Sequence, residues 1–164
     1  MTSQTPPVAG RLAQIVFAAL VLACLGAFAL TQRLKHTPTV VQSFKLTPIF
    51  SPNPTGHIKE ERISFKLASA DEVTVTILDR EGDQLATLVH DQPVARYKQF
   101  SLRWNGRSGN ASAHKTLPGA DGTTIVVPTN TGRPAPAGEY HVRVALRKQH
   151  RSVFSPGDFI LVRK

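Results

Sequence analysis

Three groups of residues have the types that chemistry requires: six histidines, an acidic turn, and a cluster of basic side chains near the C-terminus. The histidines have no ligand spacing such as HxxxH, so they do not predict a metal site. Asp79, Glu81 and Asp83 surround a glycine as in a calcium-binding loop, but the glutamate that closes such a loop is missing. Acids around a glycine are typical of hairpin turns.

The sequence also lacks the motifs of common catalytic sites. It contains no nucleophile elbow, no P-loop and no dinucleotide fingerprint. Ser51 and Ser155 lie in turn contexts, where a hydroxyl group often supports the backbone. We therefore predict a protein that is not an enzyme, with no catalytic residues, no metal site and no cofactor.

The remaining candidate site is the basic cluster near the C-terminus, which we predict to contact a polyanion. Its members are Arg143, Arg147, Lys148 and Arg151. Arg143 and Arg147 have the same parity along a predicted strand, so both side chains should point outward. The chain has 20 Lys and Arg against 11 Asp and Glu, a formal net charge of +9. This surplus indicates an acidic partner such as anionic lipid headgroups or a cell-envelope polymer.

Two further interpretations bear on the basic cluster. Nucleic acid is not the partner we expect, because no aromatic side chain is interleaved with the cluster for base stacking. The alternative to any partner is a solvated sheet face whose charge keeps the domain soluble.

The element around which the chain is organised is an apolar run at residues 12–30, which no charge interrupts. At about 1.5 Å per residue, a helix of this length covers roughly 28 Å, close to the hydrocarbon thickness of a bilayer. We predict a short tail over residues 1–11, a transmembrane signal-anchor helix over residues 12–34 that contacts the lipid bilayer, and a stem over residues 35–42.

Two alternatives to an uncleaved anchor remain. Residues 27–29 have the small-x-small pattern that precedes a signal-peptide cut, although the run is longer than the usual 7–15 apolar residues. Residues 21–24 loosely resemble a lipobox, although six membrane-compatible residues follow Cys24. Cys24 is the single cysteine, so the domain after the helix has no disulfide and no thiolate metal site.

The region over residues 43–164 has the pattern of β-structure. About seven short segments alternate apolar and polar residues, with turns roughly every ten residues, which predicts an all-β antiparallel sandwich. Residues 40–50 are predicted to form one strand with Phe44, Leu46 and Ile49 turned inward. The predicted core contains large side chains at alternating positions. These are Phe65, Val75, Ile77, Leu102, Trp104, Tyr140, Val142 and Val144.

Several short motifs occur in the order found in a known family. They are SPNP at 51–54, the strand pair around 73–79 with its REG turn at 80–82, LV at 88–89, WNGR at 104–107 and GRPAPAGEY at 132–140. Over about residues 44–147, the chain resembles the Ig-like domain of the flagellar hook-capping protein, the FlgD Ig-like family. The resemblance implies an Ig-like sandwich that is a non-catalytic module of a bacterial exported protein.

The chain departs from this family in two ways. A membrane anchor stands where the hook-capping protein has its assembly region, so a flagellar role is not carried over. An insertion at residues 108–131 lengthens a connection that is short in the family. We expect this insertion to form a protruding loop or a small hairpin.

Charge alone leaves the orientation of the anchor open, because the two ends carry similar positive charge. Arg11 and the α-amino group precede the apolar run, and Arg33 and Lys35 follow it. The resemblance favours a domain outside the cytoplasm. We therefore predict a single-pass plasma-membrane protein of the bacterial cell envelope, a non-catalytic Ig-like interaction or structural module that contacts an anionic envelope polymer or another envelope protein. The alternative is an accessory subunit or degenerate domain of an envelope enzyme.

Overall fold

The computed structural model describes residues 8–35, 39–119 and 123–163. The chain divides into two units, one ending at Pro38 and one beginning at Thr39. Most of the predicted tail, at residues 1–7, and the middle of the predicted stem, at residues 36–38, lie outside the described residues.

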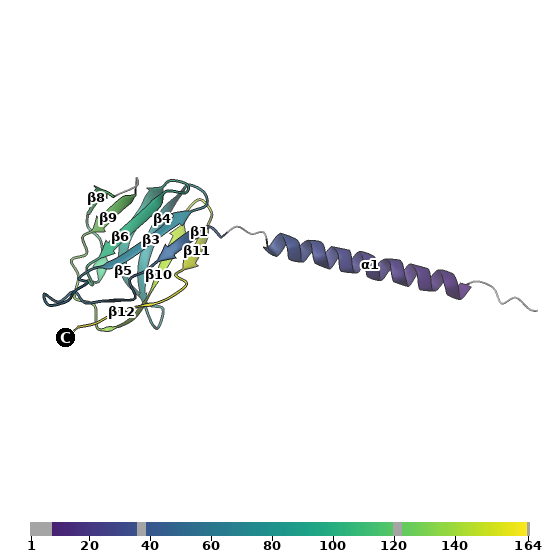
Figure 1. The fold of residues 1–164 in the computed structure, drawn as a ribbon, viewed down its shortest axis with the longest axis horizontal. Coiled ribbons are helices and arrows are strands. Elements are labelled where there is room, and N and C mark those ends of the chain that lie inside the picture. The colour runs from purple at the N-terminus through teal and green to yellow at the C-terminus, as the bar shows by residue number, and fades with distance from the viewer. Residues whose placement is uncertain (1–7, 36–38, 120–122, 164) are drawn as a thin grey trace, which may run out of the picture. The chain divides into compact units, whose positions relative to one another are not determined.

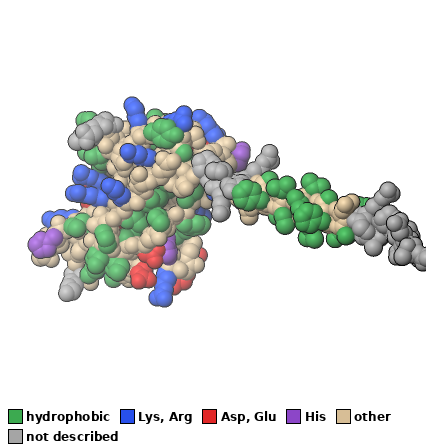
Figure 2. Space-filling model, turned by 45° about the vertical axis from the view of Figure 1, so that its right-hand side comes forward, with side chains coloured by type: hydrophobic (Ala, Val, Ile, Leu, Met, Phe, Trp, Pro, Cys, Tyr) green, Lys and Arg blue, Asp and Glu red, His purple; other side chains and the backbone are tan. Residues whose placement is uncertain are grey.

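The first unit contains one helix, α1 (Val8–Lys35), which confirms the predicted helix and extends it at both ends. Its segment Ala13–Thr31 has a mean hydropathy of 2.4, and none of it is buried. Hydrophobic side chains cover this segment in Figure 2. The Thr31 hydroxyl bonds to the carbonyl oxygens of Ala27 and Phe28, so it is satisfied within the helix. The helix has the length and composition of a membrane anchor or a signal sequence.

The second unit is β-rich and consists of two sheets that share one hydrophobic core, as in a β-sandwich (Figure 1). The five-stranded sheet has the order β1 (Val41–Lys45), β3 (Glu61–Leu67), β6 (Gln99–Trp104), β9 (Thr124–Pro128) and β8 (His114–Pro118). The seven-stranded sheet has the order β2 (Ile49–Phe50), β12 (Phe159–Leu161), β10 (Gly138–Leu146), β4 (Asp71–Asp79), β5 (Gln84–Val94) and β7 (Gly109–Asn110), with β11 (Arg151–Phe154) also paired to β10.

The sheets are mixed, which corrects the prediction of a purely antiparallel sandwich. Strands β2 and β12, β5 and β7, and β6 and β9 pair in parallel. A parallel pair requires a long crossover connection, and residues 105–123 supply one between β6 and β9. The described residues also form twelve strands rather than about seven, because several short edge strands carry no alternating pattern.

The core lies between the sheets and is centred on aromatic rings. All eight predicted core residues are buried, as their alternation along β3, β4, β6 and β10 predicted. The Trp104 ring of the five-stranded sheet lies 5.7–5.9 Å from the rings of Phe50, Tyr140 and Phe159, all in the seven-stranded sheet. The Trp104 Nε1–H donates to the Arg107 carbonyl oxygen at 2.8 Å, so this buried ring leaves no polar group unpaired.

The predicted single strand over residues 40–50 is wrong, because the segment forms β1 and β2 in different sheets. Leu46, Thr47 and Pro48 separate the two strands, and the chain crosses between sheets there. Phe50, which has the same parity as Phe44 and Leu46, is buried, whereas Ile49, which was predicted to face inward, is 54% exposed. Phe44 is half-buried as predicted and stacks on Phe65 at 5.7 Å.

Residues 108–131, predicted to form a protruding loop or a small hairpin, contribute a hairpin to the sandwich in their described part. Strands β8 and β9 form an antiparallel hairpin, and β9 extends the five-stranded sheet beside β6. Val126 in β9 is completely buried, which explains why the apolar run at residues 125–127 joins the core.

Replacing Trp104 with Ala should lower the free energy of unfolding by about 3–5 kcal/mol, because it removes a fully buried ring and opens a cavity between the sheets. Replacing Phe154, which is 58% exposed, should change it by only about 0.5 kcal/mol. Urea unfolding of the full chain in detergent, followed by circular dichroism, measures both changes. Similar values for the two variants would contradict the assigned core.

Candidate functional site

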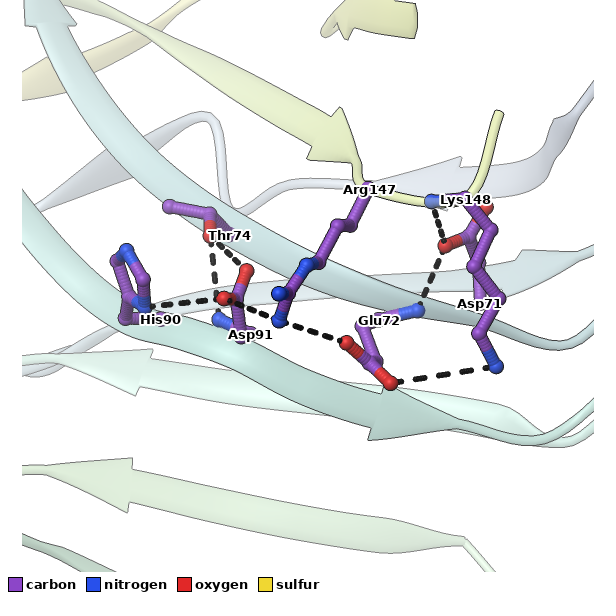
Figure 3. Close-up of polar contacts among 7 residues, drawn as sticks. All are labelled: Asp71, Glu72, Thr74, His90, Asp91, Arg147 and Lys148. Carbon is purple, nitrogen blue, oxygen red and sulfur yellow. Dashed lines mark hydrogen bonds and ion pairs between the residues drawn. The ribbon is translucent and has the colours of Figure 1, made fainter. Parts of the chain in front are cut away.

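Arg147, one member of the predicted cluster, lies on the outer side of the seven-stranded sheet between two carboxylates (Figure 3). Its Nη1 atom is 3.1 Å from Glu72 Oε2 and 2.9 Å from Asp91 Oδ2. Strand β10 pairs with β4, and β4 pairs with β5, so outward residues near the ends of these strands form a row. The guanidinium charge of Arg147 is therefore largely matched by the domain itself.

Lys148 follows in the turn after β10 and is bound through its backbone. Its N–H donates to Asp71 Oδ1 at 2.8 Å, and its Nζ lies 4.0 Å from Glu72 Oε1. Burial raises the pKa of Asp71, but hydrogen bonds from Lys148 N–H, the Gln149 amide and Glu72 N–H together hold that pKa below its usual value. Asp71 is therefore ionised at neutral pH and anchors the turn.

The other two predicted residues, Arg143 and Arg151, have no ion-pair partner among the described residues. Arg143 points outward from β10, where its Nε donates to Thr76 Oγ1 at 3.2 Å and its Nη2 to Gln84 Oε1 at 3.1 Å. Arg151 begins β11 and is exposed. The basic cluster thus consists of two cations matched by carboxylates and two that are not.

Sequence reasoning missed the acids of this surface. Asp71, Glu72 and Asp91 lie beside Arg147 and Lys148, so the surplus of positive charge around these two cations is much smaller than the sequence indicated. The alternation of side chains along β4 could have predicted that Glu72 faces outward, because Val73 and Val75 face inward.

Glu61 at the start of β3 is a completely buried carboxyl group. Its Oε1 accepts a hydrogen bond from Thr47 N–H at 2.7 Å, and its Oε2 has no partner among the described residues. Burial raises the pKa of Glu61 to about 8, against a smaller lowering by the Thr47 hydrogen bond. Glu61 is therefore mostly uncharged at neutral pH.

A histidine–aspartate pair lies near the turn between β11 and β12. His141 Nδ1 is 2.7 Å from Asp158 Oδ1, and both side chains are partly exposed. The neighbouring Ser155 hydroxyl accepts a hydrogen bond from Val142 N–H at 3.1 Å, and no hydrogen bond joins it to His141 in the described chain. This pair therefore lacks the arrangement of a serine nucleophile and its base. Over residues 8–35, 39–119 and 123–163, no three His, Cys, Asp or Glu side chains gather as metal ligands.

No protein-family model matches the chain, and no curated protein matches it significantly. The resemblance to the FlgD Ig-like family accordingly stays a prediction from the sequence motifs.

Replacing Glu61 with Gln should remove a pH-dependent loss of stability. The pKa of Glu61 rises from 4.5 to about 8 on folding, so the stability linked to its neutral form is complete below pH 4.5 and is lost as pH rises through about 8. Since Gln does not ionise, the variant should be more stable than the wild type by about 3–5 kcal/mol at a pH of about 9.

Urea unfolding of the full chain in detergent, followed by Trp104 fluorescence over a pH range of about 4 to 9, tests this difference. Glu60→Gln is the matched control, since Glu60 is partly exposed and pairs with Arg103. Its pH profile should parallel that of the wild type. An unchanged profile for Glu61→Gln would contradict the burial of a neutral carboxyl group.

Proposed function

We propose that this chain is a membrane-anchored, non-catalytic Ig-like interaction module of the bacterial cell envelope, with its domain outside the cytoplasm. The observation that carries the proposal is the apolar segment Ala13–Thr31, of which nothing is buried, on the same chain as a domain with a complete core of its own. An apolar helical segment of this length that is not buried finds a suitable environment in a bilayer.

The Ig-like assignment is supported by details of the core. Tyr140 lies near the start of β10, and its hydroxyl donates to the Pro136 carbonyl oxygen, four residues upstream, at 2.8 Å. This contact resembles the tyrosine corner of Ig-like domains. Trp104 lies between the two sheets, in keeping with a sandwich core.

The non-catalytic assignment is supported by how the polar residues are used. Catalysis requires acid, base or nucleophilic groups that converge on a place where a substrate can bind. Here the carboxylates of Asp71, Glu72 and Asp91 bind Lys148 and Arg147, and Glu61 is enclosed in the core.

The proposed partner is an anionic envelope polymer, with another envelope protein as the alternative. The basic surface formed by Arg143, Arg147, Lys148 and Arg151 supplies the attraction. Within it, Arg143 and Arg151 carry most of the unmatched charge, because the other two cations lie beside carboxylates. Such a contact should be weak and sensitive to salt.

The full chain in neutral nanodiscs should bind a purified anionic cell-wall polymer, and the affinity should fall as salt rises, since the Debye length shortens from about 10 Å at 0.1 M to about 3 Å at 1 M. The triple variant Arg143→Ala/Arg147→Ala/Arg151→Ala should bind at least about tenfold more weakly. Biolayer interferometry measures both effects.

A matched triple variant, Arg62→Ala/Arg80→Ala/Arg133→Ala, removes the same charge from exposed positions elsewhere and should bind like the wild type. Equal loss in both triple variants would show that net charge alone drives binding. Equal binding by the wild type and the first triple variant would overturn the assignment of the basic surface. Hydrolysis of the polymer by the pure chain would overturn the non-catalytic proposal.

A further inference from the structure

A hollow of about 420 Å³ lies on the outer side of the seven-stranded sheet, where β4, β5, β7 and β10 contribute its lining. This volume falls within the usual range of small-molecule sites, about 300–1,000 Å³. Its polar lining is rich in hydroxyl and amide groups. The residues concerned are Thr74, Thr76, Thr87, Gln84 and Asn110, and Arg143 lies among them. Hydroxyls and side-chain amides both donate and accept hydrogen bonds, so this lining suits a ligand with many hydroxyl groups.

Arg143 is held in the hollow by a chain of hydrogen bonds. Its Nε donates to Thr76 and its Nη2 to Gln84, and the Gln84 amide in turn donates to Thr87 Oγ1 at 3.0 Å. A guanidinium group has five N–H donors, and these two contacts leave Nη1 and part of Nη2 unused. The remaining donors are therefore fixed in position before any ligand arrives, which reduces the entropy lost on binding.

The charge of Arg143 is also unmatched. No carboxylate lines the hollow, and none lies within 4.0 Å of Arg143 among the described residues. Arg147 on the same sheet differs, since two carboxylates flank it. The other titratable group of the lining is His90, whose Nδ1 is 3.5 Å from Asp91 Oδ2. The hollow therefore offers one fixed positive charge among hydroxyl and amide groups, and the Asp91 carboxylate, which bonds to Thr74 Oγ1 at 3.4 Å, also binds Arg147.

The inserted segment builds one wall of this hollow. Asn110 and Ala111 belong to the insertion, and Ala111 N–H donates to the Thr87 carbonyl oxygen at 2.9 Å. The buried Asn130, at the far end of the insertion, donates from Nδ2 to the carbonyl oxygens of Gly109 at 2.6 Å and Thr87 at 3.1 Å. The insertion is thus clamped beside β5 at both of its ends.

We propose that this hollow binds one anionic group, a carboxylate or a phosphate, carried on a sugar. The free guanidinium donors of Arg143 match the paired oxygens of such a group. Each threonine hydroxyl already makes a hydrogen bond within the domain, and its remaining donor or acceptor capacity, together with the Asn110 amide, supplies partners for sugar hydroxyls. The proposal rests on the proposed function and deepens it, because it names the repeating chemical unit of an anionic polymer that this surface would recognise.

The test is isothermal titration calorimetry of the full chain in phosphatidylcholine nanodiscs. The probes are methyl glucuronide, glucose 6-phosphate, neutral methyl glucoside and inorganic phosphate. The two anionic sugars should bind. Methyl glucoside and inorganic phosphate should each bind at least about tenfold more weakly, because the first lacks the anionic group and the second lacks the sugar hydroxyls. Binding of glucuronide without sugar phosphate, or the reverse, would identify which anion is preferred and would support the site.

Variants locate the binding in the hollow. Arg143→Gln should weaken binding of both anionic sugars at least about tenfold, and Arg143→Lys should weaken it too, because an ammonium group lacks the paired donors. Arg80→Gln removes the same charge from an exposed position outside both the hollow and the basic surface, and should bind like the wild type. Equal binding by Arg143→Gln and the wild type would overturn the site, and inorganic phosphate binding as tightly as glucose 6-phosphate would overturn the sugar assignment.

The outcome separates this proposal from the proposed function. If the anionic sugars do not bind but the cell-wall polymer still does, the hollow is overturned and the basic surface is retained. If the anionic sugars bind at Arg143 but the polymer does not, the hollow is supported and the envelope-polymer function is overturned.

Discussion

The packing of the Trp104 ring between the two sheets is the contact on which the rest of the domain depends. It is the single tryptophan of the chain, and its ring meets three rings from three different strands of the opposite sheet. Burial of such large rings is among the strongest contributions that a domain of this size can obtain. Because β2, β10 and β12 each contribute one ring, their positions relative to β6 are set together.

The outer surface follows from this core. The Trp104 indole bonds to the Arg107 carbonyl oxygen and so fixes where the insertion leaves β6. Asn130 then ties the start of the insertion to β5, beside the hollow that contains Arg143. Inward residues of β10 pack against the aromatic core, and the alternate ones, including Arg143, form the outer row. One strand therefore joins the core to the proposed binding surface.

Much of the fold was predictable from alternation, because Phe65, Ile77 and Val142 lie on strands with one buried face. Prediction failed where the chain changes sheets near Pro48, since the local alternation of residues does not show that the segment forms two strands of different sheets. The site was predictable only in part. Outward positions for Arg143 and Arg147 follow from local spacing, whereas the carboxylates beside Arg147 come from residues more than fifty positions away. Strand register brings them together, and one sequence does not specify register between distant strands.

The central claim is that the helix anchors the chain in a membrane with the domain outside the cytoplasm. The most direct measurement is labelling of the double variant Cys24→Ala/Thr116→Cys in intact spheroplasts with a membrane-impermeant maleimide, since Thr116 is exposed on β8. The account predicts full labelling before lysis, with the labelled chain retained in the membrane fraction. Labelling only after the membrane is permeabilised, or release of the labelled chain into the soluble fraction, would contradict it.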